Sequence, residues 1–114
     1  MRRPSAGDLG ERVTFQRRIE ASDGYGNTVS TWQDEFSTRA RMMPKMGSES
    51  VIASRLQGVQ PYILTVRSNR YTKDVTPAWR VLWGGDEFNI KTAANVDERG
   101  EFIEMMVVKG GATG

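Results

Sequence analysis

The side chains that most often perform catalysis or bind metals are missing or scattered in this sequence. It contains no histidine and no cysteine, which removes the commonest general base, the thiolate nucleophile and the usual ligands of zinc. The carboxylates lie mostly in predicted turns, as Asp97 and Glu98 do, or on predicted solvent faces, as Glu104 does. The sequence therefore gives no positive evidence for an enzyme, and a domain with carboxylate chemistry is only a distant alternative.

Two glycine-containing segments also fall short of known binding motifs. Gly84-Gly85 lacks the Lys-Ser/Thr pair that a phosphate-binding loop needs. Residues 23–27, Asp-Gly-Tyr-Gly-Asn, offer two oxygen-bearing side chains, too few for a calcium site. No run approaches the roughly 18 consecutive apolar residues of a membrane helix, and the two arginines near the N-terminus precede no signal-peptide core. We therefore expect no cofactor, no metal and no membrane contact.

Alternation of apolar and polar residues predicts a mainly β chain. Strands are predicted over 12–17, 28–33, 38–43, 62–67, 79–83, 87–90 and 101–108. The clearest hairpin turns at Gly84-Gly85, and a longer turn is expected over 23–27. One short helix is predicted over 48–57, with Ile52 and Leu56 on the face that docks on the sheet.

Core positions follow from the same alternation. Trp79, Val81 and Trp83 share one face of their strand and are predicted to form a core stripe. The methionines at and after the predicted strand 38–43, namely Met42, Met43 and Met46, are suited to gap filling or to adaptable contacts, and we assign them to the core.

Short strands at fairly even spacing predict a small antiparallel β-barrel of six to seven strands with long loops. Closure is favoured because it removes the exposed edges that an open sheet would leave, and a sandwich is the alternative. A length of 114 residues fits a single domain, 1–114. Flexible ends are expected over 1–6 and 109–114.

The charge pattern does not single out a nucleic-acid ligand. Sixteen basic residues stand against fourteen acidic ones, for a net charge of +2, and no block of five or more like charges occurs. A single-strand-binding barrel of the OB type, which stacks bases on exposed aromatics, remains an alternative function. Its candidate residues are Tyr62, Trp79 and Trp83 with Arg67 and Arg80.

The segment from Gly7 to Arg17, Gly-Asp-Leu-Gly-Glu-Arg-Val-Thr-Phe-Gln-Arg, resembles the opening strand of the phage head–tail joining family. This family contains head completion or stopper proteins of long-tailed phages, prophages and gene transfer agents. The order of the later segments is also similar to that of the family. These segments are 23–27, Trp32, 39–41, 64–67, 80–90 and 95–99. The resemblance extends from about Gly7 to Val108.

The resemblance implies a non-enzymatic structural subunit of a virion or phage-like particle, made in the bacterial cytoplasm. It implies a ring of identical subunits, six-fold in the particle, below portal and adaptor proteins and above tail terminator or tail tube proteins. Double-stranded DNA would pass through the channel, and the ring would help to retain it and to dock the tail. A neighbouring tail-completion protein with a similar barrel is the alternative within this class.

Two segments, 44–60 and 68–76, are predicted to contact these partners or the channel. The candidate residues are basic or aromatic. They are Arg2, Arg3, Lys45, Arg55, Arg70, Tyr71 and Lys73. No catalytic, cofactor-binding or metal-binding residue is predicted.

Overall fold

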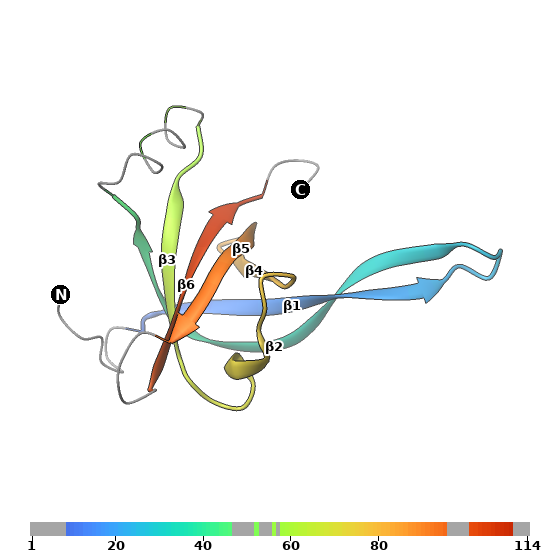
Figure 1. Cartoon of the computed structure of the whole chain (residues 1–114), viewed down its shortest axis with the longest axis horizontal. Helices are drawn as coiled ribbons and strands as arrows, with labels where there is room; N and C mark the ends of the chain where they lie inside the picture. The colour runs from blue at the N-terminus through green and yellow to red at the C-terminus, as the bar shows by residue number, and fades with distance from the viewer. Residues whose placement is uncertain (1–8, 47–51, 53–55, 57, 96–100, 111–114) are drawn as a thin grey trace.

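The computed structural model describes residues 9–46, 52, 56, 58–95 and 101–110 (Figure 1). Its strands are β1 (Glu11–Ser22), β2 (Thr28–Pro44), β3 (Pro61–Arg67), β4 (Arg80–Trp83), β5 (Asp86–Asn95) and β6 (Phe102–Lys109). A 3-10 turn covers Thr72–Asp74, between β3 and β4. The chain is therefore mainly β, as predicted.

The six strands form a closed antiparallel barrel in the order β1-β2-β3-β6-β5-β4. Closure depends on β4 returning to β1, where Val81 lies opposite Phe15. Every described strand pair is antiparallel. This arrangement confirms the predicted barrel and excludes the alternative sandwich.

The barrel is filled by the apolar side chains that alternate along its strands. The fully buried ones of largest volume include Phe15, Leu64 and Met105. Trp79 and Trp83 pack against this core beside Val81, so the predicted stripe is confirmed. Burying large apolar side chains is the main term that stabilises such a domain.

The β4–β5 hairpin closes through Gly84 and Gly85, as predicted. Both have positive φ angles, 60° and 85°, and Trp83 pairs with Asp86 on either side of the turn. Two positive φ angles in succession match the twist of antiparallel strands, and glycine adopts them without steric cost.

Strand β2 is continuous, whereas the sequence patterns predicted two strands, 28–33 and 38–43. The expected break is absent because residues 34–37, Asp-Glu-Phe-Ser, contain no glycine or proline to interrupt pairing with β1. The seven predicted strands are thus six.

A β-bulge marks the middle of the β1–β2 pair. Phe15 lies opposite Phe36 and Gln16 lies opposite Asp34, so Glu35 is an extra residue on β2. Bulges bend a strand and increase its twist. This one coincides with Gln16, the last residue of β1 that pairs with β4, so the bend falls where the hairpin leaves the barrel.

Beyond the bulge, β1 and β2 continue as a two-stranded arm, residues 17–33, that projects across the direction of β3 and β6 (Figure 1). Pairing runs from Arg17 opposite Gln33 to Ser22 opposite Thr28, a length of roughly 20 Å. The radius of gyration is 15.4 Å, above the about 13 Å expected for a compact chain of this length. The arm accounts for the elongated shape.

Three predictions, for the helix, the methionines and the chain ends, are wrong in part or fall outside the described residues. The helix predicted over 48–57 falls mainly on residues that the structure does not describe, but Ile52 and Leu56 are 51% and 84% exposed. Their predicted docking on the sheet is therefore wrong. Met42 packs against the core as predicted, whereas Met43 and Met46 are exposed. The predicted flexible ends lie largely outside the described residues.

Candidate interaction surfaces

The foot of the arm is fixed to the barrel by a chain of polar contacts. Gln16, which is buried, donates from Nε2 to Oδ1 of Asp34 at 2.5 Å. Its own Oε1 accepts a hydrogen bond from Nε of Arg80 at 2.6 Å. Arg80 also forms an ion pair with Glu87 on β5, with Nη1 and Oε2 3.1 Å apart. The chain therefore connects β2, β1, β4 and β5 at the point where the arm begins.

Arg80 adds a contact to the arm itself. Its guanidinium carbon lies 4.3 Å from the ring centroid of Trp32, which is a cation–π geometry. The Arg80 side chain is only 14% exposed, so solvent screens these interactions less than at an open surface. This one arginine holds the first part of the arm against the barrel wall.

An aromatic cluster covers the other side of the foot. Phe36 stacks on the buried ring of Phe15, with centroids 4.9 Å apart. The rings of Tyr71 and Trp79, both from the β3–β4 loop, lie 5.8 Å and 6.3 Å from Phe36. The loop and the arm therefore pack together, although they are distant in the sequence.

The β3–β4 loop is ordered by one buried hydroxyl. Thr72 Oγ1 donates to the carbonyl of Arg67 at 2.7 Å and accepts from the backbone N–H of Asn69 at 2.8 Å. The side chain of Asn69 in turn accepts from the N–H groups of Tyr71 and Thr72. These local bonds form an Asx-type turn, which presents the next side chains outward in a defined geometry.

The structure brings three of the predicted interface residues together on this loop. Arg70, Tyr71 and Lys73 are all exposed, and Arg70 donates to the hydroxyl of Tyr71 at 2.7 Å while lying over its ring. Lys45 lies elsewhere, after the end of β2, where its N–H donates to the carbonyl of Pro61 at 2.9 Å. The remaining candidates, Arg2, Arg3 and Arg55, lie outside the described residues.

The tip of the arm presents a single aromatic side chain. Tyr25 is 88% exposed and stands between Gly24 and Gly26, both with positive φ. Asp23 orders this turn, because its Oδ1 accepts from the N–H groups of Tyr25 and Asn27 at 2.7 Å and 3.2 Å. The Tyr25 hydrogen bond is the main cause that lowers the pKa of the Asp23 carboxyl below its usual 3.8.

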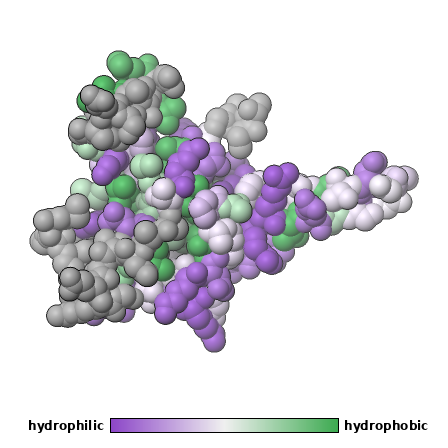
Figure 2. Space-filling model, viewed as in Figure 1, coloured by the Kyte–Doolittle hydropathy of each residue, from purple (hydrophilic) through white to green (hydrophobic). Residues whose placement is uncertain are grey.

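The opposite end of the barrel is more apolar. Figure 2 shows apolar side chains at the end that carries the β2–β3 connection, and hydrophilic ones where the arm begins. Exposed apolar residues here are Met43, Met46, Ile52 and Leu56. An open groove of about 410 Å³ lies near this end, lined in part by Tyr62, Phe88, Asp86 and Lys109. Surfaces of this kind suit contacts with other proteins.

The geometry gives little support to base stacking on the aromatic residues. Tyr62 and Trp83 pack edge-to-face at 5.5 Å and both contact Phe88, while Trp79 packs toward Phe36. Arg80 is engaged by Gln16 and Glu87. The rings that would hold bases are thus already used within the barrel.

The described residues contain no group of three or more acidic side chains placed to hold a metal ion. Within the same part of the chain, no helix is long and apolar enough to span a membrane. The described surface instead has three features suited to contacts with other molecules. They are a projecting arm, an ordered loop at its foot and an apolar end.

Comparison with known proteins assigns the family. A model of the phage head completion protein family matches residues 4–110. The chain belongs to this family. It is therefore a head-completion structural protein, a component of virion particles, as the resemblance at its N-terminal strand implied. No curated protein sequence matches the chain.

Two solved structures share the fold. A chain from the virion of a native gene transfer agent particle is 19% identical, with a TM-score of 0.66, over 95% of this chain and 98% of that one. The solution structure of protein SF1141 from Shigella flexneri 2a is 20% identical, with a TM-score of 0.71, over 96% and 99%. The fold is thus shared across nearly the full length of chains of low identity.

The sequence predicted a hairpin of 12–17 and 28–33 around the turn over 23–27, which β1 and β2 confirm, but it did not predict that this hairpin projects as an arm or how its foot is fixed. A signal for the arm was present, because residues 28–43 contain no glycine or proline and β-branched residues are frequent near Thr28. No local pattern indicated that Gln16, Asp34 and Arg80 would meet, since the contact depends on the bulge and on barrel closure.

Proposed function

We propose that this head completion protein forms a ring with copies of itself at the head–tail joint. Portal or adaptor proteins would lie on the head side, and tail terminator or tail tube proteins on the tail side. The subunit is made in the bacterial cytoplasm and acts in the particle without catalysis. The absence of histidine and cysteine from the sequence supports the last point.

The observation that carries this proposal is the arm. Pairing of β1 with β4 ends at Gln16–Arg80, and pairing of β2 with β3 ends at Ala40–Val66. No described strand hydrogen-bonds to either outer edge of the arm. Unpaired edges are templates for pairing with another chain. The arm edge on β2 begins with the uncharged residues Thr28-Val29-Ser30-Thr31, three of which are β-branched, and it lacks the charges that usually prevent such pairing.

A ring would follow from a head-to-tail contact of this kind. The arm lies on one side of the barrel (Figure 1), so an arm that binds the wall of the next subunit makes a heterologous contact. Repeated contacts close into a ring when the rotation permits. Each contact can be modest, because several copies act together.

In such a ring, the DNA that leaves the head would pass through the central channel. The connection between β2 and β3, residues 45–60, begins at the apolar end of the barrel, near Met43 and Met46. We propose that this end contacts a neighbouring ring or narrows the channel. Retention of DNA and docking of the tail are then two results of one assembly.

The test shortens the arm and leaves its foot intact. Deleting 19–22 and 28–31 removes four opposed pairs and about 13 Å of arm, while Trp32 and the turn over 23–27 remain. An even number of residues from each strand keeps every side chain on its original face. Particles carrying this variant are expected to yield filled or leaking heads beside free tails in electron micrographs.

The matched control exchanges Val29 and Thr31, which keeps the length and composition of the arm. Both residues are exposed and β-branched, so this variant should give intact tailed particles. Circular dichroism and thermal unfolding establish that both variants fold. Normal tailed particles from the folded, arm-shortened variant would remove the arm from the assembly and contradict the proposal.

A further inference from the structure

The outer face of the barrel carries arginines that the strand register brings together. Arg12 on β1 lies directly opposite Arg39 on β2. Ala40 pairs with Val66, so Arg39 and Arg67 each lie one residue beyond that pair on neighbouring strands. Arg12, Arg39 and Arg67, from three adjacent strands, are called here the arginine row.

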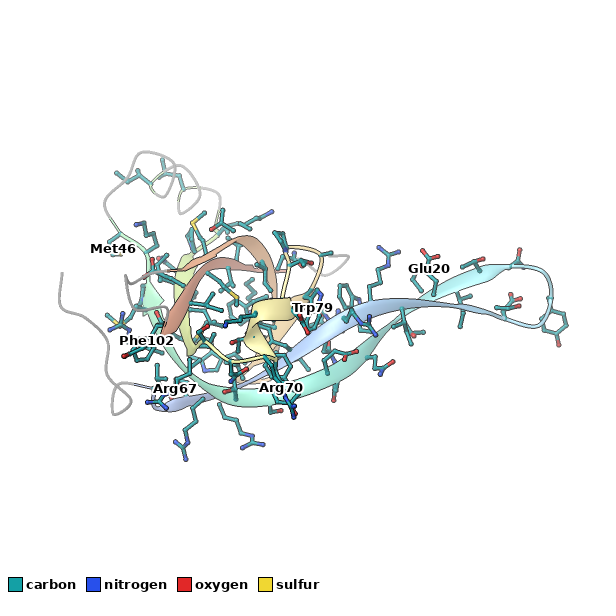
Figure 3. The ribbon with its side chains drawn as sticks, turned by 60° about the horizontal axis from the view of Figure 1, so that its bottom comes forward. Glu20, Met46, Arg67, Arg70, Trp79 and Phe102 are labelled. Carbon is teal, nitrogen blue, oxygen red and sulfur yellow. The ribbon has the colours of Figure 1, made fainter. Side chains whose placement is uncertain are left out.

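The three side chains of the row point away from the core. All are exposed, whereas the adjoining residues Val13, Ala40 and Val66 belong to the core, and Arg67 lies along the lower edge of the barrel in Figure 3. Neighbouring strands are about 4.8 Å apart, so three guanidinium groups share roughly 10 Å. No ion pair or side-chain hydrogen bond joins them to another described residue.

This arrangement costs stability. Like charges directly opposite each other on antiparallel strands are destabilising, and Arg12 and Arg39 are such a pair. By contrast, Arg17 forms an ion pair with Glu35 and Arg80 forms one with Glu87. A ligand of opposite charge explains why the row would be kept without partners.

The surroundings of the row fit the same ligand. Arg41 follows two residues after Arg39 on the same strand and so lies on the same face. On the other side, the hydroxyls of Thr14 and Ser37 lie 2.8 Å apart. The carboxylate of Glu104 is not part of this group, because it lies on β6, one strand beyond β3. Guanidinium groups and hydroxyls together are the groups that most often contact phosphate oxygens in proteins.

We propose that the arginine row binds the phosphate backbone of duplex DNA. Arginine presents a planar fork that matches phosphate, and such charge-assisted bonds are strong. Duplex DNA carries one negative charge per about 1.7 Å of its axis, so it supplies several charges within the span of the row. On a protein partner, carboxylates spaced this closely would repel one another as the arginines of the row do, whereas DNA carries closely spaced charges in any case. Nucleic acid is therefore favoured as the partner.

This inference deepens the proposed function, and rests on it only for the presence of DNA beside the subunit. The contact is to backbone and carries no sequence preference. It identifies the face that carries the row, on β1, β2 and β3, as the face turned toward DNA.

The test measures binding of the full chain to a fluorescent duplex of about 20 base pairs by anisotropy, over about 20–200 mM salt. The row variant replaces Arg12, Arg39 and Arg67 with Gln. Each phosphate contact contributes about 0.9 to the slope of log affinity against log salt, so the slope should fall by roughly 2 to 3 units. At about 50 mM salt the affinity should fall at least roughly tenfold.

The matched control removes three positive charges elsewhere, with Arg17, Arg18 and Lys91 replaced by Gln. It should retain affinity within about threefold of the wild type. Thermal unfolding checks folding, and the row variant should unfold no earlier than the wild type because it relieves repulsion. Equal losses in the control and the row variant would overturn the proposal.

Two further outcomes separate this inference from its alternatives. Tighter binding of polyglutamate than of the duplex would overturn nucleic acid as the partner and indicate an acidic protein. The arm-shortened variant keeps the row, so it should bind the duplex as the wild type does. Loss of tails in that variant with unchanged binding supports both proposals, and normal tails with unchanged binding contradicts only the proposed function.

Discussion

Strand β1 passes through two environments, and their comparison explains much of the molecule. Its first half, up to Gln16, forms part of the barrel wall and places Val13 and Phe15 in the core. Its second half forms the arm, where Ile19 is half-buried and its neighbours are exposed. One continuous strand thus has a part held by burial and a part held by pairing with a single partner strand.

The difference shows how the arm can be ordered without a core of its own. Two-stranded hairpins are at most marginally stable in water by themselves. This one is fixed at one end, where Trp32 meets Arg80 and Phe36 meets Phe15, and closed at the other by the Asp23 turn. The barrel supplies the stability, and the arm forms a projecting surface that other chains can reach.

The largest expected effect contrasts two positions on β1. Phe15→Ala removes a fully buried ring and should reduce the free energy of unfolding by about 3–5 kcal/mol. Ile19→Ala, four residues further along in the arm, should cost about 1 kcal/mol or less, because its side chain is partly solvated. Urea denaturation followed by tryptophan fluorescence measures both. Similar costs at the two positions would contradict the division of β1 into core and arm.

The next effect concerns the residue that connects the two regions. Arg80→Met keeps an aliphatic stem but removes the hydrogen bond to Gln16 and the ion pair with Glu87. Hydrogen bonds to charged groups contribute about 1.5–3 kcal/mol, so a loss of about 2 kcal/mol is expected. Amide exchange around Trp32 should also become faster. Arg18→Met, which removes an exposed contact to Ser30, serves as the control and should leave both quantities unchanged.

A third effect lies in the loop that packs on the foot of the arm. Thr72→Val keeps the shape but leaves the carbonyl of Arg67 and the N–H of Asn69 without their buried partner. The expected loss is about 1–3 kcal/mol in unfolding free energy. Thr76→Val removes an exposed bond to Ala78 and should change stability by less than about 0.5 kcal/mol. If the two substitutions cost the same, the buried hydroxyl does not order the loop.

The sequence predicted the barrel well because barrel strands carry their burial in the alternation of side chains. Val13 and Phe15, or Trp79 and Val81, indicate both a strand and its inner face. Gly84-Gly85 likewise defined a hairpin through backbone freedom alone. Such features depend on residues close together in the chain.

Features that depend on register were not predictable from the sequence. Arg12, Arg39 and Arg67 are far apart in the chain and form no run of charge, so the positive charge is evenly distributed along the sequence. Pairing of β1, β2 and β3 brings them into one row. The continuity of β2 was missed for a related reason, since a bulge at Glu35 reverses the alternation in the middle of a strand.

The smallest expected effect is confined to the tip of the arm. The N–H of Tyr25, and then that of Asn27, stabilise the ionised carboxyl of Asp23 and lower its pKa below 3.8. When a folded-state pKa is lower than the unfolded one, the contribution is complete above the unfolded value and is lost as pH falls through the folded pKa. The turn should therefore loosen as pH falls below about 3.8.

Chemical shifts and exchange rates of the Tyr25 and Asn27 amides measure this transition. Asp23→Asn keeps an acceptor oxygen but cannot ionise, so its tip should give a flat pH profile over the same range. The urea midpoint of the variant at neutral pH should equal that of the wild type, because the Asp23 side chain is exposed at the end of the arm. A shift in that midpoint would mean that the tip of the arm and the barrel unfold together as one cooperative unit.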